Sequence, residues 1–283
     1  MHDDNEQDGA PKRTSRVPFT RRKLMDEPIR TEVSDRIATV RFNRPAAFNA
    51  FDRDMITSLA DTLAELAKDT DVVGVIMTGE GKAFCTGGDL KWLAASGKSY
   101  GSMFHFLAAR YHLAILEVRR MPKPVIAAIN GLAAGGGFSL ALACDFRVMD
   151  SSAILRQAYT SNGLSIDGGG THSLPRMVGL ARSMEIAALD RPIPSRLALA
   201  WGLVTDVVPD GHSHKKSVEL IREICRRPVS SFAASKRLLI DSFNTSFESQ
   251  LEKEREFLAG CADHSNGKEG IEAFLQKRRP HYV

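Results

Sequence analysis

The chain has 283 residues, of which 43% are hydrophobic and 25% charged, and its formal net charge is +4. This balance is sufficient for a hydrophobic core in one large domain or two small ones. The mild charge, and the lack of a basic segment with interleaved aromatic residues, argue against a nucleic-acid partner. No apolar run approaches the length of a membrane span, and the N-terminus lacks the apolar core of a signal peptide. We therefore expect a soluble protein without a membrane partner.

The cysteines and histidines form no recognisable ligand or disulfide pattern. Cys85, Cys144, Cys225 and Cys261 contain no CxxC pair, which suits a reducing compartment, and we expect the protein in the cytoplasm. The eight histidines are scattered without an HxxxH or HExxH spacing, so no metal site is expected.

The N-terminal part predicts a tail, a strand pair and a helix. Residues 1–28 are acidic and then basic, which indicates a disordered polar tail. Residues 29–42 alternate between apolar and polar side chains, so we expect two strands with a turn near Ser34-Asp35. Apolar side chains at helical spacing predict a helix over residues 51–68.

Two apolar strands are each followed by a glycine-rich turn and a helical segment. The first strand, residues 72–78, precedes GEGKAFCTGGDL at 79–90, and the second, residues 124–129, precedes NGLAAGGG at 130–137. Glycine lets the backbone approach a ligand closely, and the first amides of a helix have no partner within it. Two such amides directed at one point form an oxyanion hole, which stabilises a negatively charged oxygen.

The remaining chain alternates between helices and short strands and then becomes helical. Residues 102–120 predict a long helix that carries His105 and His112 on one face, and strands are expected at 145–148 and 154–155. A loop over 160–173 should lead into a helix at Leu174. Further helices are expected at 183–189, 196–201, 213–226, 230–243, 247–263 and 268–278. This order predicts an α/β core over residues 29–200 and a helical region over 201–283.

Several motifs in one colinear order resemble the crotonase, or enoyl-CoA hydratase/isomerase, family across residues 30–283. They are Asn43-Arg44-Pro45 with Asn49-Ala50, AFCTGGDL, NGLAAGGG, GGGT and WGLV. The resemblance implies a spiral of ββα units, a C-terminal helical region that builds trimers or hexamers (dimers of trimers), and a coenzyme A thioester as substrate without a separate cofactor. It also implies that the backbone amides of Gly88 and Gly136 form the oxyanion hole for a thioester enolate.

The same resemblance implies contacts to the substrate. The coenzyme A contacts fall on the backbone around Ala47, Ala83, Cys85 and Gly87. Phe274 and Lys277 match positions that, in the family, reach the nucleotide from a neighbouring subunit. Asp89 follows Gly88 at the substrate site, where we expect its carboxylate to cap the next helix. Cys85 is expected to be a small packing residue rather than a nucleophile.

The chain departs from the hydratase pattern at two positions. Family hydratases carry two glutamates, and the matching positions here hold Ser139 and Tyr159. Hydration needs one group to activate water and another to deliver the proton to the α-carbon. Because neither Ser139 nor Tyr159 is a carboxylate, efficient hydration is not expected. Tyr159 could instead hydrogen-bond to the substrate and narrow the acyl pocket.

Asp167 is the candidate base. It lies in GLSIDGGGT, residues 163–171, which resembles the active-site loop of double-bond isomerases in the family, although Ile166 replaces the usual proline. One carboxylate suffices to take a proton from one carbon of a dienolate and return it to another. The alternative is that Asp167 only caps the following helix. His172, five residues further on, is the nearest candidate in sequence to orient it.

Three functions follow from these residues. The first is isomerisation of an enoyl-CoA or ring acyl-CoA, and the second is an atypical hydratase that uses Asp167 with Tyr159. The third is a catalytically weak binding protein, for example for RNA, through the basic run Lys215, Lys216, Arg222, Arg226 and Arg227, which otherwise reads as a solvated helix face. Thioesterase and dehalogenase activities also belong to the family's range.

Overall fold

The structure is a computed structural model that describes residues 27–282. The predicted disordered tail lies outside the described residues, apart from Glu27 and Pro28.

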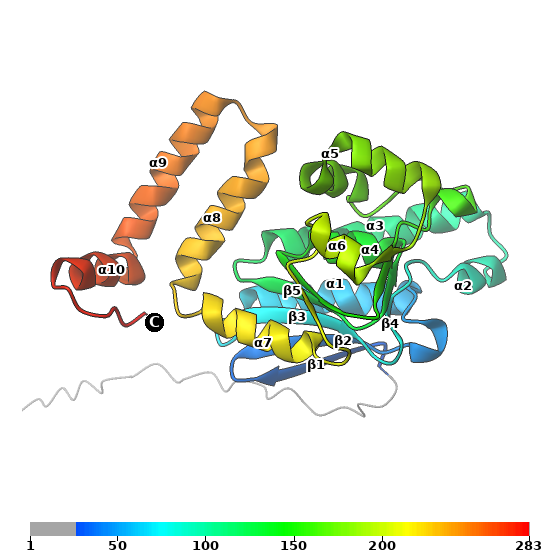
Figure 1. The fold of residues 1–283 in the computed structure, drawn as a ribbon, viewed down its shortest axis with the longest axis horizontal. Helices are drawn as coiled ribbons and strands as arrows, with labels where there is room; N and C mark the ends of the chain where they lie inside the picture. The colour runs from blue at the N-terminus through cyan, green and yellow to red at the C-terminus, as the bar shows by residue number, and fades with distance from the viewer. Residues whose placement is uncertain (1–26, 283) are drawn as a thin grey trace, which may run out of the picture.

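Two sheets build the core (Figure 1). The large sheet has the order β1-β2-β3-β5-β7-β10, with β1 antiparallel to β2 and all other pairs parallel. The small sheet has the order β4-β6-β8-β9, in which β8 and β9 are antiparallel. The strands are β1 Ile29–Ser34, β2 Ile37–Phe42, β3 Gly74–Gly79, β4 Ala83–Cys85, β5 Val125–Ile129, β6 Leu132–Ala134, β7 Phe146–Asp150, β8 Ile154–Arg156, β9 Ile193–Pro194 and β10 Asp206–Val208.

Successive strands alternate between the sheets before each helix. β3 and β4 precede α2 and α3, β5 and β6 precede α4, and β7 and β8 precede α5, which is the spiral of ββα units that the family resemblance implied. The helices are α1 Arg53–Lys68, α2 Leu90–Ala95, α3 Tyr100–Arg120, α4 Gly136–Ala143, α5 Gly170–Leu189, α6 Ser195–Ala200, α7 Ser213–Ile224, α8 Val229–Asp241, α9 Phe247–Asp263 and α10 Ser265–Leu275, with single 3-10 turns at Pro45–Ala47, Thr160–Asn162 and Ser242–Asn244.

Hydrophobic clusters cover both faces of the large sheet. On β3, Val75 and Met77 join the larger cluster with α1, α3 and α4, while Ile76 faces the smaller cluster under α7. This alternation follows from the period of two along a strand. All eight residues of α4 are buried, as expected for a helix that is apolar on every side.

The long elements match the sequence predictions, but the start of α5 and four short strands do not. α5 begins at Gly170, four residues before the predicted Leu174, and continues to Leu189 through a break at Gly179, whose φ is 75°. The predicted separate helix at 183–189 is therefore its second half. β4, β6, β9 and β10 have three residues or fewer, too few to show a period in the sequence.

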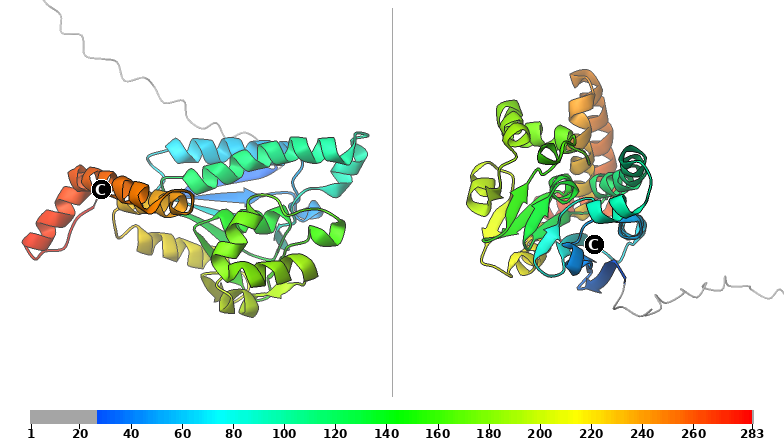
Figure 2. Two further views of the ribbon diagram at one scale, coloured as in Figure 1. Left: turned by 90° about the horizontal axis from the view of Figure 1, so that it is seen from above. Right: turned by 90° about the vertical axis from the view of Figure 1, so that its right-hand side faces the viewer.

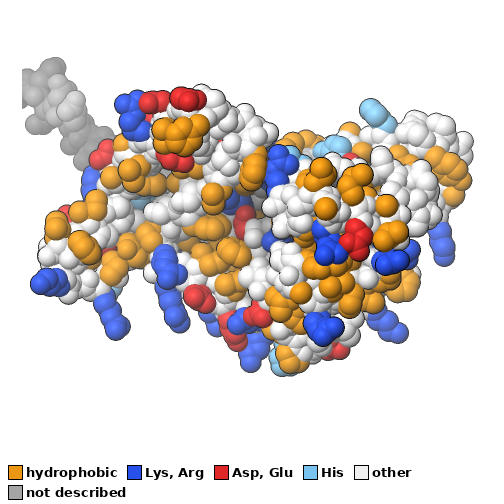
Figure 3. Space-filling model, turned by 45° about the horizontal axis from the view of Figure 1, so that its top comes forward, with side chains coloured by type: hydrophobic (Ala, Val, Ile, Leu, Met, Phe, Trp, Pro, Cys, Tyr) orange, Lys and Arg blue, Asp and Glu red, His pale blue; other side chains and the backbone are white. Residues whose placement is uncertain are grey.

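The last three helices stand to one side of the sheets (Figures 1 and 2). Beyond residue 200, β10 forms the edge strand of the large sheet and α7 packs against that sheet. The proposed division of domains at residue 200 stays a prediction. In Figure 3, hydrophobic side chains reach the surface on the left part of the molecule, where α8–α10 lie in Figure 1. None of the helices in residues 27–282 has the length and apolar character needed to cross a membrane.

A buried ion pair joins α8 to the sheet. Lys236 Nζ lies 2.8 Å from Asp145 Oδ2, and the two side chains are 5% and 13% exposed. The same carboxylate accepts the Val125 N–H at 2.8 Å, and Lys236 also donates to the carbonyl of Val118. Burial raises the pKa of Asp145, and the nearby Lys236 opposes that shift. Asp145 is therefore a structural residue that joins α8 to the sheet.

We predict that Lys236→Met lowers the free energy of unfolding by about 3–5 kcal/mol, because it leaves a buried carboxylate without its cation. Lys216→Met is the control, since it removes a pair with Asp206 in which both side chains are about 40% exposed, and should cost at most about 1 kcal/mol. Urea unfolding curves of both variants measure the difference. Equal losses would contradict the structural role of the Lys236 pair.

Candidate active site

A cavity of about 410 Å³ lies where the two glycine turns meet the loop before α5. Its wall is mostly apolar, with aromatic rings from three parts of the chain. It is lined by Phe51, Gly88, Tyr100, Gly101, Phe104, His105, Leu107, Ala108, Tyr111, Gly136, Tyr159, Leu164, Ser165, Ile166 and Asp167. Gly88, Gly136, Tyr159 and Asp167, which the sequence singled out, therefore meet in one cavity.

Parallel pairing of β4 with β6 brings the two glycine turns into contact. Both turns follow the carboxyl ends of adjacent strands, with Ala83 opposite Leu132. A Cβ on Gly87, whose φ is 81°, would lie 2.6 Å from the Gly136 nitrogen. A Cβ on Gly137 would lie 2.0 Å from the Cys85 carbonyl oxygen. Glycine is required at both positions because backbone approaches backbone there.

The backbone N–H groups of Gly88 and Gly136 take no part in the strand and helix hydrogen bonds around them. Gly88 forms a parallel bridge with Phe51, in which Phe51 N–H donates to Gly87 O and Asp89 N–H donates to Phe51 O. In such a bridge the peptide groups of Gly88 itself point away from Phe51. Gly136 is the first residue of α4, so its N–H has no acceptor within the helix.

The Asn-Arg-Pro and Asn-Ala motifs hold the first turn in place. Asn49 is fully buried, and its Nδ2 donates to the carbonyl of Ala83 at 2.8 Å. Arg44 pairs with Asp89 at 2.9 Å and with Asp52 at 3.1 Å. Asp89 also accepts the Trp92 N–H at 3.0 Å, which confirms that it caps α2. These contacts fix the chain on both sides of Gly88.

Tyr111, on α3, contacts both the glycine turn at Gly136 and the glycine-rich loop at Gly168. Its hydroxyl donates to the Gly136 carbonyl at 2.5 Å, and a Cβ on Gly168 would lie 2.4 Å from its ring. The side chain is 4% exposed, and burial raises its pKa well above the usual range, so it stays a neutral donor. Tyr111 belongs to none of the sequence motifs that indicated the site.

Asp167 is paired with a histidine from α3. His112 Nε2 lies 2.6 Å from Asp167 Oδ1, and the side chains are 52% and 35% exposed. The expectation that His172 orients Asp167 is wrong. His172 lies in a second cavity with Arg119 and Arg237, where burial and the nearby Arg176 and Arg119 lower its pKa. The heptad spacing showed that His112 shares a helix face with His105, but it did not indicate the contact with Asp167, which is 55 residues away in the sequence.

Ser139 and Tyr159 lie together beside the Asp167 loop. The Tyr159 hydroxyl lies close to the Ser139 side chain and to the backbone of Asp167, and burial followed by the Asp167 charge raises the Tyr159 pKa. Ser139 is 3% exposed, and a Cβ on Gly170 would lie 2.9 Å from its hydroxyl oxygen. The two positions that hold glutamates in the hydratase pattern are therefore occupied by two neutral, neighbouring side chains.

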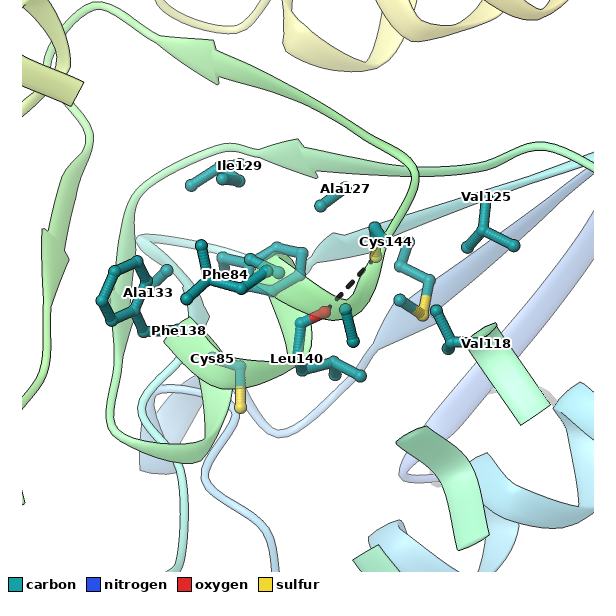
Figure 4. Packing of buried hydrophobic residues seen from close by; sticks show 14 of the residues in the cluster. Phe84, Cys85, Val118, Val125, Ala127, Ile129, Ala133, Phe138, Leu140 and Cys144 are labelled. Carbon is teal, nitrogen blue, oxygen red and sulfur yellow. Dashed lines mark hydrogen bonds between the residues drawn. The ribbon is translucent and has the colours of Figure 1, made fainter. Parts of the chain in front are cut away.

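The other residues expected to contact substrate do not line this cavity. Ala83 and Cys85 are buried on β4, and Figure 4 shows the Cys85 side chain near Phe138 and Leu140 of α4. Burial raises the Cys85 pKa to about 12, which fits a packing residue. Ala47 ends a 3-10 turn, and Gly87 precedes the lining residue Gly88. Phe274, 82% exposed on α10, and Lys277, just after it, also lie outside the cavity wall.

Between residues 27 and 282, no group of three or more His, Cys, Asp or Glu side chains is arranged to hold a metal ion. On α7, Lys216 pairs with Asp206 and Arg222 pairs with Asp35 at 2.6 Å, so acidic side chains interrupt the basic run.

Comparisons with known proteins agree with this architecture. Residues 32–283 match the family model described as enoyl-CoA hydratase/isomerase. A probable enoyl-CoA hydratase of Rhodobacter capsulatus is 34% identical over 90% of this chain and 97% of its own. The 1,2-epoxyphenylacetyl-CoA isomerase of Escherichia coli is 31% identical over 92% and 99%. The crystal structure of an enoyl-CoA hydratase from Polaromonas sp. JS666 superposes with a TM-score of 0.85 at 33% identity, covering 90% of this chain and 99% of that one. The chain belongs to the enoyl-CoA hydratase/isomerase family and has the crotonase fold.

Proposed function

We propose that the protein binds an acyl-CoA thioester and isomerises a double bond in its acyl group. The thioester oxygen accepts hydrogen bonds from the amides of Gly88 and Gly136, which stabilise the enolate formed when the α-proton leaves. Asp167 takes that proton and returns it to another carbon. Preorganised amides of this kind contribute about 3–4 kcal/mol each to such a reaction.

The observation that carries this proposal is that a carboxylate lines the same cavity as the two candidate amides. Asp167 is the one carboxylate among the described residues that line it, and it shares the wall with Gly88 and Gly136. A carboxylate near the enolate can act as a general base without a second acid. The alternative expectation, a helix cap, has weaker support, because α5 begins at Gly170 without any side-chain cap.

The neutral Ser139–Tyr159 pair argues against an efficient hydratase. Neither group is a base that activates water, since burial keeps Tyr159 protonated. An atypical hydratase that uses Asp167 with Tyr159 is the rival within the family.

The lining favours an apolar acyl group that is ring-shaped or short. Phe51, Phe104, Tyr111 and Tyr159 surround the cavity with aromatic faces, and Leu164 and Ile166 close the side next to Asp167. Flat apolar groups pack well against such rings. The polar coenzyme A part would extend toward Ala47 and the β4 segment, where the family resemblance implies its contacts.

We propose that three chains assemble and that α8–α10 form the contact. In a single chain these helices leave large apolar side chains exposed, including Leu239, Leu258, Phe274 and Leu275 at 70% or more. In such an assembly Phe274 and Lys277 of one chain would reach the coenzyme A nucleotide bound to the next. A native mass of three or six chains supports this assembly, and a monomer contradicts it.

The test of the reaction compares two thioesters of equal chain length, a 3-enoyl-CoA and a 2-enoyl-CoA. We expect the 3-enoyl-CoA to gain conjugation, followed by ultraviolet absorbance, and Asp167→Asn to lower that rate by about 10²–10⁴-fold, because the amide cannot accept the proton. Asp61→Asn, at an exposed position of α1, is the matched control and should leave the rate unchanged. Hydration of the 2-enoyl-CoA without isomerisation of the 3-enoyl-CoA would support the hydratase instead, and a rate that is indifferent to Asp167→Asn would contradict Asp167 as the base.

Gly88→Ala tests the oxyanion site separately from folding. The new Cβ would lie 3.7–3.9 Å from Leu107, Phe104 and Leu93, which is ordinary contact, so we expect stability to change little. Because the methyl group enters the cavity, we expect turnover to fall on the order of 100-fold. Gly137→Ala should instead lower the free energy of unfolding by about 2 kcal/mol or more, since its Cβ collides with the Cys85 carbonyl. Unchanged turnover in Gly88→Ala would contradict the role of this turn.

A further inference from the structure

Asp167 lies between the acyl cavity and a histidine that reaches solvent. Asp167 lines the cavity, whereas His112 is not among its lining residues. His112 contacts the carboxylate through Nε2 at 2.6 Å and is 52% exposed. The next residue toward the N-terminus, Tyr111, points into the protein and bonds to Gly136, with the two rings 6.2 Å apart. His112 therefore connects the candidate base to water from outside the cavity.

We infer that His112 is a relay that exchanges the proton held by Asp167 with solvent. This inference rests on the proposed role of Asp167 as the base. When the C–H bond of the substrate breaks, its electron pair becomes the enolate and the proton forms an O–H bond on Asp167. That acid donates the proton to Nε2 of a neutral imidazole whose own proton is on Nδ1, which restores the carboxylate and leaves an imidazolium. The imidazolium then swings away from Asp167 into solvent, where its Nε2–H exchanges with water, and the ring returns to donate that solvent proton to the carboxylate.

The relay changes the isotopic outcome of the reaction. A carboxylate without such a partner keeps the abstracted proton and returns it to the substrate. With the relay, a solvent proton replaces it during the lifetime of the enolate. His172 cannot substitute for His112, because it lies in the cavity lined by Arg119 and Arg237 rather than against Asp167.

The experiment is isomerisation of a 3-enoyl-CoA in D₂O, stopped at low conversion, with mass spectrometry of the product. We expect most wild-type product to carry one deuterium at C4. His112→Gln keeps a hydrogen-bonding side chain but cannot carry the proton, so the deuterated fraction should fall by about tenfold. His172→Gln is the matched control and should behave as wild type. The labelled fraction does not depend on how much active protein is present, so a purely structural role of His112 would leave it unchanged.

A second substrate separates this inference from the proposed function. Phenylacetyl-CoA has acidic α-protons but no double bond to move, so its exchange with D₂O reports the relay even if no enoyl-CoA is isomerised. We expect exchange by the wild type and about tenfold slower exchange by His112→Gln. Wild-type isomerisation without deuterium, equal labelling in His112→Gln, or absence of wild-type exchange on phenylacetyl-CoA would each overturn the relay. Exchange that His112→Gln slows, without isomerisation of the 3-enoyl-CoA, would support the relay and contradict the isomerase.

Discussion

The site depends on the parallel pairing of two three-residue strands, β4 and β6. Each is too short to be stable alone, and each is followed at once by a glycine turn. Their pairing brings Gly87 against the nitrogen of Gly136 and Gly137 against the carbonyl of Cys85 at distances that no Cβ tolerates. The buried helix α4 then begins where the two turns touch. The relative position of the two candidate amides is thus set by backbone contact and does not depend on mobile side chains.

Helix α3 joins this backbone framework to the candidate base. Consecutive helical residues point about 100° apart, so neighbours in sequence can serve different surroundings. Tyr111 is buried and bonds to Gly136 while packing on Gly168, and His112 faces out and contacts Asp167. The Gly136 turn and the Asp167 loop are therefore held by one rigid element, which favours a constant separation between the proposed oxyanion site and the carboxylate.

The sequence predicted the elements with a long hydrophobic pattern and the turns that depend only on neighbouring residues. Helix α9 has the predicted limits of Phe247–Asp263, and both glycine turns lie where strand and turn residues indicated. The lack of a carboxylate at Ser139 and Tyr159 was also visible, because it needed only a count from shared motifs. The start of α5 was missed because Gly170 follows other glycines, which are poor helix formers. The His112–Asp167 contact could not be predicted, since it depends on how α3 crosses a loop 55 residues away.

The most direct test of the account is a crystal structure of the protein with a non-reactive acyl-CoA analogue. We predict that the thioester oxygen lies about 2.7–3.1 Å from the backbone nitrogens of both Gly88 and Gly136. The α-carbon should face the Asp167 carboxylate, with His112 on the side of the carboxylate away from the acyl group. A thioester oxygen bound away from these two amides, or an α-carbon that faces another wall of the cavity, would contradict the proposed chemistry.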